Sequence, residues 1–173
     1  MKPAAQHPDR DRFLNAIFFL ALLIFILIAV FVHIYPVNQF DSYIQEQMRP
    51  LAVPALLPFW IYLTFLGSFA FLFPAWRHRP STPLIPSLID YSFPSGHSTS
   101  SFIFCAVLIY SLWHSAVSRS LLIAGISFLM ILACSIGLSR IVLNAHYPTD
   151  VTAGFCFGAL WSTGWYRFIH KKI

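Results

Sequence analysis

The chain is organised around Tyr91-Ser92-Phe93-Pro94-Ser95-Gly96-His97-Ser98, read together with Ser139-Arg140, five further residues, and His146-Tyr147-Pro148-Thr149-Asp150. Both stretches lie at the ends of hydrophobic segments whose interiors are almost free of charge. In so apolar a chain, polar chemistry is most economically placed at such segment ends. The two stretches therefore predict one site that binds and transfers a phosphoryl group.

The composition predicts an integral membrane protein. Of 173 residues, 58% are hydrophobic, 17% are aromatic and 10% are charged, which is far from the composition of soluble domains. The net charge of +5 comes mainly from the termini and short connections, as expected of groups beside anionic lipid on the cytoplasmic face. No motif or basic stripe predicts a nucleic-acid partner, so the expected surroundings are the lipid bilayer.

The three cysteines are expected to be small packing residues. They lie inside hydrophobic segments and lack C-x-x-C spacing, so neither a disulfide framework nor a zinc site is indicated. They are Cys105, Cys134 and Cys156.

The first half of the chain predicts a retained span and an interfacial segment. Residues 13–35 are long and apolar enough to cross a bilayer, and they lack the small-residue cleavage site of a signal peptide. Residues 37–58, with several prolines and charges, suit a short helix or loop at the outer interface. Residues 59–76 are short for a span and could be re-entrant.

The second half predicts three spans within residues 97–169, after a proline-rich loop. Arg119 and the basic C-terminus are expected in the cytoplasm, which places His97, Arg140 and His146 near the opposite, outer face. The predicted fold class is therefore all-α: a polytopic transmembrane helical bundle forming a single membrane-embedded domain over residues 1–173.

The number of hydrophobic runs does not agree with the positions of the basic residues. Five hydrophobic runs are visible, whereas basic residues at both termini favour an even number of crossings. Either residues 59–76 are re-entrant, or the N-terminus is outside, or a helix has been lost. The sequence leaves these alternatives open.

The stretch Pro94-Ser95-Gly96-His97 is typical of an anion site. Small residues at the start of a helix present free backbone N–H groups, and the helix dipole favours a phosphate there. A Ser-Gly pair is also an ordinary helix cap, but His97 beside it is placed to act as a general acid or base.

Arg140, His146 and Asp150 form the second half of the predicted site. Arg140 could extend to lipid headgroups, yet its guanidinium also matches phosphate oxygens. His146 and Asp150 are four residues apart, so a helix would place them on one face, with the carboxylate fixing the ring tautomer. A surface ion pair and a metal site are the alternatives, and a metal is disfavoured because Asp90 is the one obvious further carboxylate.

These residues resemble the second and third signature motifs of the type 2 phosphatidic acid phosphatase family, membrane lipid phosphatases that share an active site with vanadium haloperoxidases. The resemblance implies a mechanism without metal or cofactor. It implies that His146 attacks phosphorus to form a phosphohistidine, that Asp150 orients His146, and that His97 protonates the leaving oxygen. It assigns phosphate binding to four residues: Arg79, Ser95, Gly96 and Arg140.

The chain departs from the family's first motif, which is a lysine, six residues and Arg-Pro. Arg79-Pro80 fits its end, but Leu72 stands where the lysine is expected. Family members usually have six spans, so the resemblance also indicates the loss of most of one hairpin between about Pro74 and Arg77. Without the lysine, a rate lower by roughly a hundredfold is expected, unless Arg77 or His78 partly substitutes.

The resulting functional prediction is hydrolysis of a phosphate monoester or diphosphate on a membrane lipid: undecaprenyl diphosphate first, then phosphatidylglycerol phosphate or phosphatidate. The expected location is a bacterial inner membrane, with the site facing the periplasm. A lipid phosphotransferase using the same intermediate and a catalytically silent protein that binds lipid headgroups are the alternatives.

Overall fold

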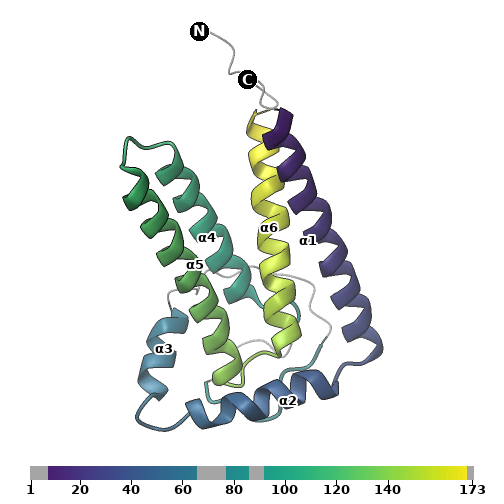
Figure 1. Cartoon of the computed structure of the whole chain (residues 1–173). Coiled ribbons are helices and arrows are strands. Elements are labelled where there is room, and N and C mark those ends of the chain that lie inside the picture. Colours follow the sequence, from purple (N-terminus) through teal and green to yellow (C-terminus); the bar gives the residue numbers. More distant parts are fainter. Residues whose placement is uncertain (1–7, 66–76, 86–91, 171–173) are drawn as a thin grey trace.

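The computed structural model describes residues 8–65, 77–85 and 92–170 (Figure 1). These residues form helices and connections and contain no β-strand, so the all-α prediction is confirmed. The helices are α1 (Pro8–Ile34), α2 (Gln39–Met48), the short 3₁₀ helix η1 (Arg49–Leu51), α3 (Leu57–Phe65), α4 (Gly96–Trp113), α5 (Arg119–Val142) and α6 (Pro148–His170).

The ends of the helices follow from the local sequence. Three helices begin after a residue whose side chain accepts a hydrogen bond from a backbone N–H in the first turn, namely Asn38 for α2, Ser95 for α4 and Ser118 for α5. Such caps satisfy N–H groups that have no partner within the helix. The last helix begins at Pro148, where the fixed backbone angle of proline suits the first helical position.

The long helices pack as two pairs joined through α6. Helix α1 lies along α6, α4 packs against both α6 and α5, and the pair α4–α5 diverges from the pair α1–α6 at one end of the bundle (Figure 1). Helix α2 runs across the other end, in contact with α5 and α6, and α3 packs on α5. The predicted interfacial segment 37–58 therefore contains α2 and η1, together with the beginning of α3.

Close approach between α4 and α6 depends on two glycines of α6. A Cβ atom added to Gly154 would lie 2.6 Å from the carbonyl oxygen of Ser95, and one added to Gly158 would lie 2.9 Å from Cβ of Phe102. The hydroxyl of Thr99 reaches across the same contact, 3.1 Å from the carbonyl oxygen of Gly154. The start of α4 is thus held directly against the start of α6.

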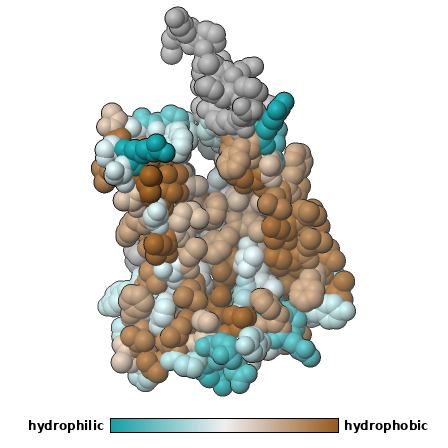
Figure 2. All heavy atoms as spheres, in the orientation of Figure 1, coloured by the Kyte–Doolittle hydropathy of each residue, from teal (hydrophilic) through white to brown (hydrophobic). Residues whose placement is uncertain are grey.

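The outer surface of the bundle is apolar. Large hydrophobic side chains are more than half exposed on both α1 and α5, for example Leu23, Leu27 and Phe128. Figure 2 shows hydrophobic residues along the side of the bundle that α1 forms. In water such a surface would be unfavourable, whereas hydrocarbon chains accommodate it. Within the described part of the chain, two helices are long and apolar enough to cross a membrane, over Arg12–Ile34 and Arg119–Val142.

The structure describes only the beginning of the hydrophobic run 59–76. Helix α3 covers the first part of this run, and residues 66–76, including Leu72 and Pro74, lie outside the described residues. Within residues 97–169, where three spans are predicted, the structure has three helices, α4, α5 and α6.

Candidate active site

The site is built around His146, in the connection between α5 and α6. Asn144 reverses the chain there with a φ of 51°, a left-handed conformation that asparagine tolerates better than most residues. Its side-chain amide donates to the carbonyl oxygen of Thr82 at 3.0 Å, and the backbone N–H of Leu84 donates to Leu143 at 3.0 Å. The connection is thereby fixed against residues 77–85.

Hydrogen bonds determine the tautomer of His146. Its Nε2 atom lies 3.1 Å from Nη1 of Arg79, and its Nδ1 atom lies 2.8 Å from the carbonyl oxygen of Ser92. A guanidinium can only donate, so Nε2 must accept and Nδ1 must carry the proton. The lone pair on Nε2 therefore points toward the arginine.

Positive charge surrounds this imidazole. Burial lowers the pKa of His146 well below its ordinary value, and the charges of Arg140, Arg79 and His97 lower that pKa further. The ring is consequently neutral at physiological pH, which is the form in which a histidine can act as a nucleophile.

Asp150 approaches His146 without forming a hydrogen bond to it. Its Oδ2 atom is 3.9 Å from Nδ1 of His146 and accepts the backbone N–H of Tyr147 at 2.9 Å. The four-residue spacing leads one to expect a direct hydrogen bond, but α6 begins only at Pro148, so His146 precedes the helix and does not share its face. The carboxylate acts on the ring at ion-pair distance, while Ser92 holds Nδ1.

Arg79 and Arg140 approach from two different segments. Nη1 of Arg79 also donates to the carbonyl oxygen of Ala145 at 2.7 Å. Arg140, in the last turn of α5, is 4% exposed and donates from Nη1 to the hydroxyl of Thr64 at 2.6 Å. Its Nε atom is buried and has no hydrogen-bond partner. An unsatisfied buried donor on a charged group is destabilising, so this position is suited to receive an anionic oxygen.

The predicted phosphate cradle lies at the start of α4. Ser95 is fully buried, and its backbone N–H donates to the carbonyl oxygen of Asp150 at 2.9 Å. Gly96 and His97 follow it in the first turn and are only partly buried. All seven predicted site residues are therefore described, and they come from the ends of α4, α5 and α6 and from the segment that carries Arg79.

Sequence reasoning gave no role to Asp41 and Thr64, and it quoted Ser92 without giving it one. Arg77 is expected as a partial substitute for the absent lysine, but its guanidinium is bonded to Asp41 and Asp150. His78 is exposed. The rarity of acidic residues in the chain was the one signal that could have drawn attention to Asp41.

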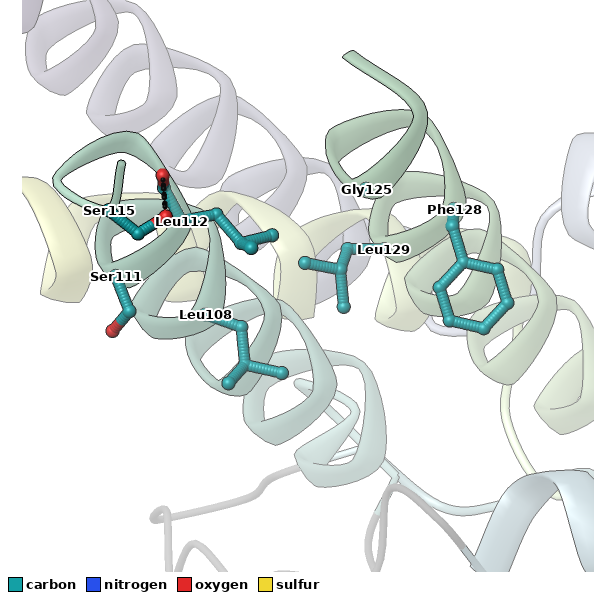
Figure 3. Close-up of a pocket in the computed structure, with 7 residues that line it drawn as sticks. All are labelled: Leu108, Ser111, Leu112, Ser115, Gly125, Phe128 and Leu129. Carbon is teal, nitrogen blue, oxygen red and sulfur yellow. Dashed lines mark hydrogen bonds between the residues drawn. The ribbon is translucent and has the colours of Figure 1, made fainter. Parts of the chain in front are cut away.

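A separate cavity of about 450 Å³ lies between α4 and α5. Figure 3 shows leucines of α4 facing Leu129 of α5 across it. The cavity is lined by Leu108, Ser111, Leu112, Ser115, Gly125, Phe128 and Leu129. None of these side chains ionises near neutral pH, so the cavity is not suited to phosphate chemistry. Among the residues that the structure describes, no group of three His, Cys, Asp or Glu side chains could hold a metal ion.

Comparisons with known proteins agree on one family. The model of the PAP2 superfamily matches residues 14–173. A lipid A 1-phosphatase of Rhizobium johnstonii is 37% identical over 75 residues, which are 41% of this chain and 25% of that protein. A decaprenylphosphoryl-5-phosphoribose phosphatase of Mycobacterium tuberculosis is 36% identical over 87 residues, or 48% of this chain and 42% of that protein. The chain thus spans less than half the length of these relatives.

The fold also has a counterpart among solved structures. The crystal structure of a transmembrane PAP2-type phosphatidylglycerolphosphate phosphatase from Bacillus subtilis superposes with a TM-score of 0.75 at 23% identity. The superposition covers 90% of this chain and 96% of that chain. The bundle described above is therefore a transmembrane fold.

Proposed function

The chain belongs to the PAP2 superfamily, and from this membership we propose that it hydrolyses a phosphate monoester or diphosphate carried by a membrane lipid. The observation that carries the proposal is the arrangement at His146. A neutral imidazole directs its Nε2 lone pair toward Arg79, and a second arginine keeps a buried donor without a partner. This arrangement combines a nucleophile with an anion site.

In the proposed reaction the phosphate is held by Arg79, Arg140 and the backbone N–H groups at the start of α4. Nε2 of His146 attacks phosphorus, and the bond between phosphorus and the leaving oxygen breaks. His97 gives its proton to that oxygen. A water molecule then attacks the phosphohistidine and returns a proton to His97, which releases inorganic phosphate and restores His146.

Asp150 has an electrostatic role in this scheme. Phosphorylation of Nε2 makes the imidazole cationic while Nδ1 keeps its proton. A carboxylate at 3.9 Å favours that cation, because an opposite charge at such a distance in a buried site stabilises the charged form. Ser92 would hold the ring orientation throughout.

The proposed location is a bacterial inner membrane with the site on the periplasmic side. Figure 1 shows the start of α1, the connection between α4 and α5, and the end of α6 at one end of the bundle, opposite the site. Arg12, Arg119 and Arg167 belong to these three places. Cationic residues gathered at one end favour placing that end in the cytoplasm.

For the substrate we propose a polyprenyl carrier, undecaprenyl diphosphate, ahead of phosphatidylglycerol phosphate and phosphatidate. The family resemblance supports all three, and the decaprenyl-linked relative supports the polyprenyl class. The same intermediate could pass its phosphoryl group to another lipid hydroxyl, so the test has to measure transfer as well as release.

The test measures phosphate release from these three lipids, and transfer of their phosphoryl group to an added lipid with a free hydroxyl, by the purified chain in detergent. EDTA is present, and His146→Ala is measured beside the unmodified chain. We expect release that survives EDTA and disappears in the variant. Vanadate, which imitates the transition state of phosphoryl transfer, should inhibit it. A folded protein that binds vanadate and transfers the phosphoryl group without releasing phosphate would refute hydrolysis and favour a phosphotransferase, and one that does neither would favour a lipid-binding role.

A further inference from the structure

A buried ion network lies beside the site and outside the set of residues proposed to touch phosphate. Nη2 of Arg77 donates to Oδ2 of Asp41 at 2.6 Å, and Nη1 donates to Oδ1 of Asp150 at 2.8 Å. The side chains of Arg77 and Asp41 are 1% and 0% exposed. Two carboxylates therefore share one guanidinium away from solvent.

The network joins parts of the chain that are distant in sequence. Nε of Arg77 donates to the carbonyl oxygen of Pro36 at 2.7 Å, and Nη1 also donates to the hydroxyl of Thr149 at 2.8 Å. The guanidinium carbon lies 3.7 Å from the centre of the Tyr147 ring. Arg77 thus contacts the connection after α1, helix α2, the connection before α6 and the first turn of α6.

Asp41 connects α2 to the first turn of α6. Its Oδ1 atom accepts the backbone N–H of Thr149 at 3.0 Å, and its Oδ2 atom accepts the Thr149 hydroxyl at 2.7 Å. The side-chain amide of Asn38 donates to Oδ2 as well, at 2.7 Å. A residue of α2 therefore serves as a partner for the N-terminus of α6.

Arg77 reaches His146 along two routes. Its side chain holds Asp150, which is the carboxylate nearest to His146 Nδ1. Its backbone carbonyl oxygen accepts the N–H of Ser92 at 2.7 Å, and the carbonyl oxygen of Ser92 accepts Nδ1 of His146 at 2.8 Å. Both groups that face Nδ1 are thus fixed by the same arginine.

We propose that Arg77 and Asp41 are positioning residues for the phosphohistidine reaction. Arg77, itself held by Asp41, keeps the Asp150 carboxyl group 3.9 Å from Nδ1 of His146. It also fixes Ser92, whose carbonyl oxygen accepts the Nδ1 proton. The two groups that face Nδ1 thereby keep their positions while the imidazole becomes cationic in the intermediate. This inference rests on the proposed function.

The kinetic test compares Arg77→Gln, Arg77→Lys and Asp41→Asn with the control Arg119→Gln. Arg119 is exposed at the opposite end of the bundle. We expect Arg77→Gln to lower kcat by about a hundredfold, the effect of a small misplacement of reacting groups, with KM changed less than about threefold. Arg77→Lys keeps a positive charge at this position and should be folded, but it should have only part of the kcat of the unmodified chain. An ammonium group cannot form the same set of hydrogen bonds as a planar guanidinium.

A double-mutant cycle separates positioning from general structural loss. If Arg77 acts through Asp150, then Arg77→Gln should reduce kcat much less in the Asp150→Asn background than in the unmodified chain. Equal losses in both backgrounds, in variants that unfold at similar temperatures, would overturn the proposal. A loss confined to KM would overturn it as well.

A second readout does not depend on activity. In protein labelled with nitrogen-15 histidine, the Nδ1 signal of His146 is assigned by its absence in His146→Gln. We expect Arg77→Gln to displace this signal, because Asp150 is then free to accept Nδ1–H, and Arg119→Gln to leave it unchanged. Asp41→Asn, which preserves the shape of the side chain, provides the same comparison where Arg77→Gln does not fold.

The two readouts distinguish the possible failures. Phosphate release by the unmodified chain, combined with an unchanged His146 signal in folded Arg77→Gln, refutes positioning and keeps the proposed function. A displaced signal in a chain that releases no phosphate refutes the proposed function and supports the positioning contact.

Discussion

Replacing Gly154 by alanine tests whether close contact between α4 and α6 sets the geometry of the site. An added Cβ atom would lie 2.6 Å from the carbonyl oxygen of Ser95 and 2.9 Å from Cβ of Ser98. Neither contact is the end of a flexible side chain, since one is backbone and the other is a Cβ atom. The two helices must therefore move apart at the residues that form the proposed phosphate cradle.

The magnitude follows from these distances. Ordinary contacts of a Cβ atom begin at 3.4 Å, so the Ser95 carbonyl must retreat by about 0.8 Å from its 2.6 Å position. Overpacking of this kind destabilises a fold by about 1–3 kcal/mol. A shift of about 1 Å in a catalytic geometry lowers the rate by about a hundredfold, so the variant should lose activity even at temperatures where it remains folded.

The assay pairs Gly154→Ala with Gly164→Ala in the same helix. A Cβ atom on Gly164 would approach nothing closer than Cε2 of Phe18, at 3.9 Å. The control should therefore keep full activity and gain about 0.5–1 kcal/mol of helix stability. Thermal unfolding in detergent and phosphate release are measured on both variants at a temperature where each is folded.

Two results would refute this reasoning. Gly154→Ala with unimpaired phosphate release would show that the contact between α4 and α6 does not control the site. Equal losses in Gly154→Ala and Gly164→Ala would show that any alanine in α6 is harmful, whatever space surrounds it.

Two further predictions follow from the same site. Thr64→Val removes the hydroxyl that accepts a hydrogen bond from Nη1 of Arg140 and should raise KM by several-fold to about tenfold. The measurement is phosphate release against lipid concentration, and unchanged kinetics would show that Thr64 does not orient the arginine. The pKa of His146 is lowered in the folded chain from its ordinary value of 6.5. Below that pH the unfolded chain therefore binds a proton at this residue that the folded chain does not bind. The unfolding temperature should fall as the pH decreases below that value, and it should fall less steeply in His146→Gln.

Much of the site could be predicted because its residues lie at the ends of helices. Ser95 caps α4 and Arg140 lies in the last turn of α5. The hydrophobic runs indicated where such ends fall, and the distribution of basic residues predicted that His97, Arg140 and His146 lie near one face of the membrane. The alternation of apolar runs and polar connections also predicted three hydrophobic segments within residues 97–169, where α4, α5 and α6 lie. Helix ends and apolar runs depend on residues that are close in sequence, so local sequence patterns can predict them.

The contacts that sequence patterns could not predict are long-range. Arg77 lies 36 residues from Asp41 and 73 from Asp150, and no periodicity relates such positions. The bond between His146 Nδ1 and Ser92 likewise joins residues 54 apart. The spacing of His146 and Asp150 was misleading for a different reason, because helical geometry applies only from Pro148 onward. The membership of the chain in a phosphatase family was therefore predictable, but the long-range contacts that support the candidate site were not.

The contacts of Arg77 make the position of the site independent of how many residues lie between α2 and residue 77. Every side-chain contact of Arg77 described here is with a residue before α3 or after α5: Pro36, Asp41, Tyr147, Thr149 and Asp150. Its guanidinium therefore fixes where the chain re-enters the site, regardless of the route by which the chain arrives. A hairpin could be inserted or deleted upstream of residue 77, and the geometry around His146 would be preserved as long as these contacts remained. Proteins with different numbers of helices can in this way share one reaction centre.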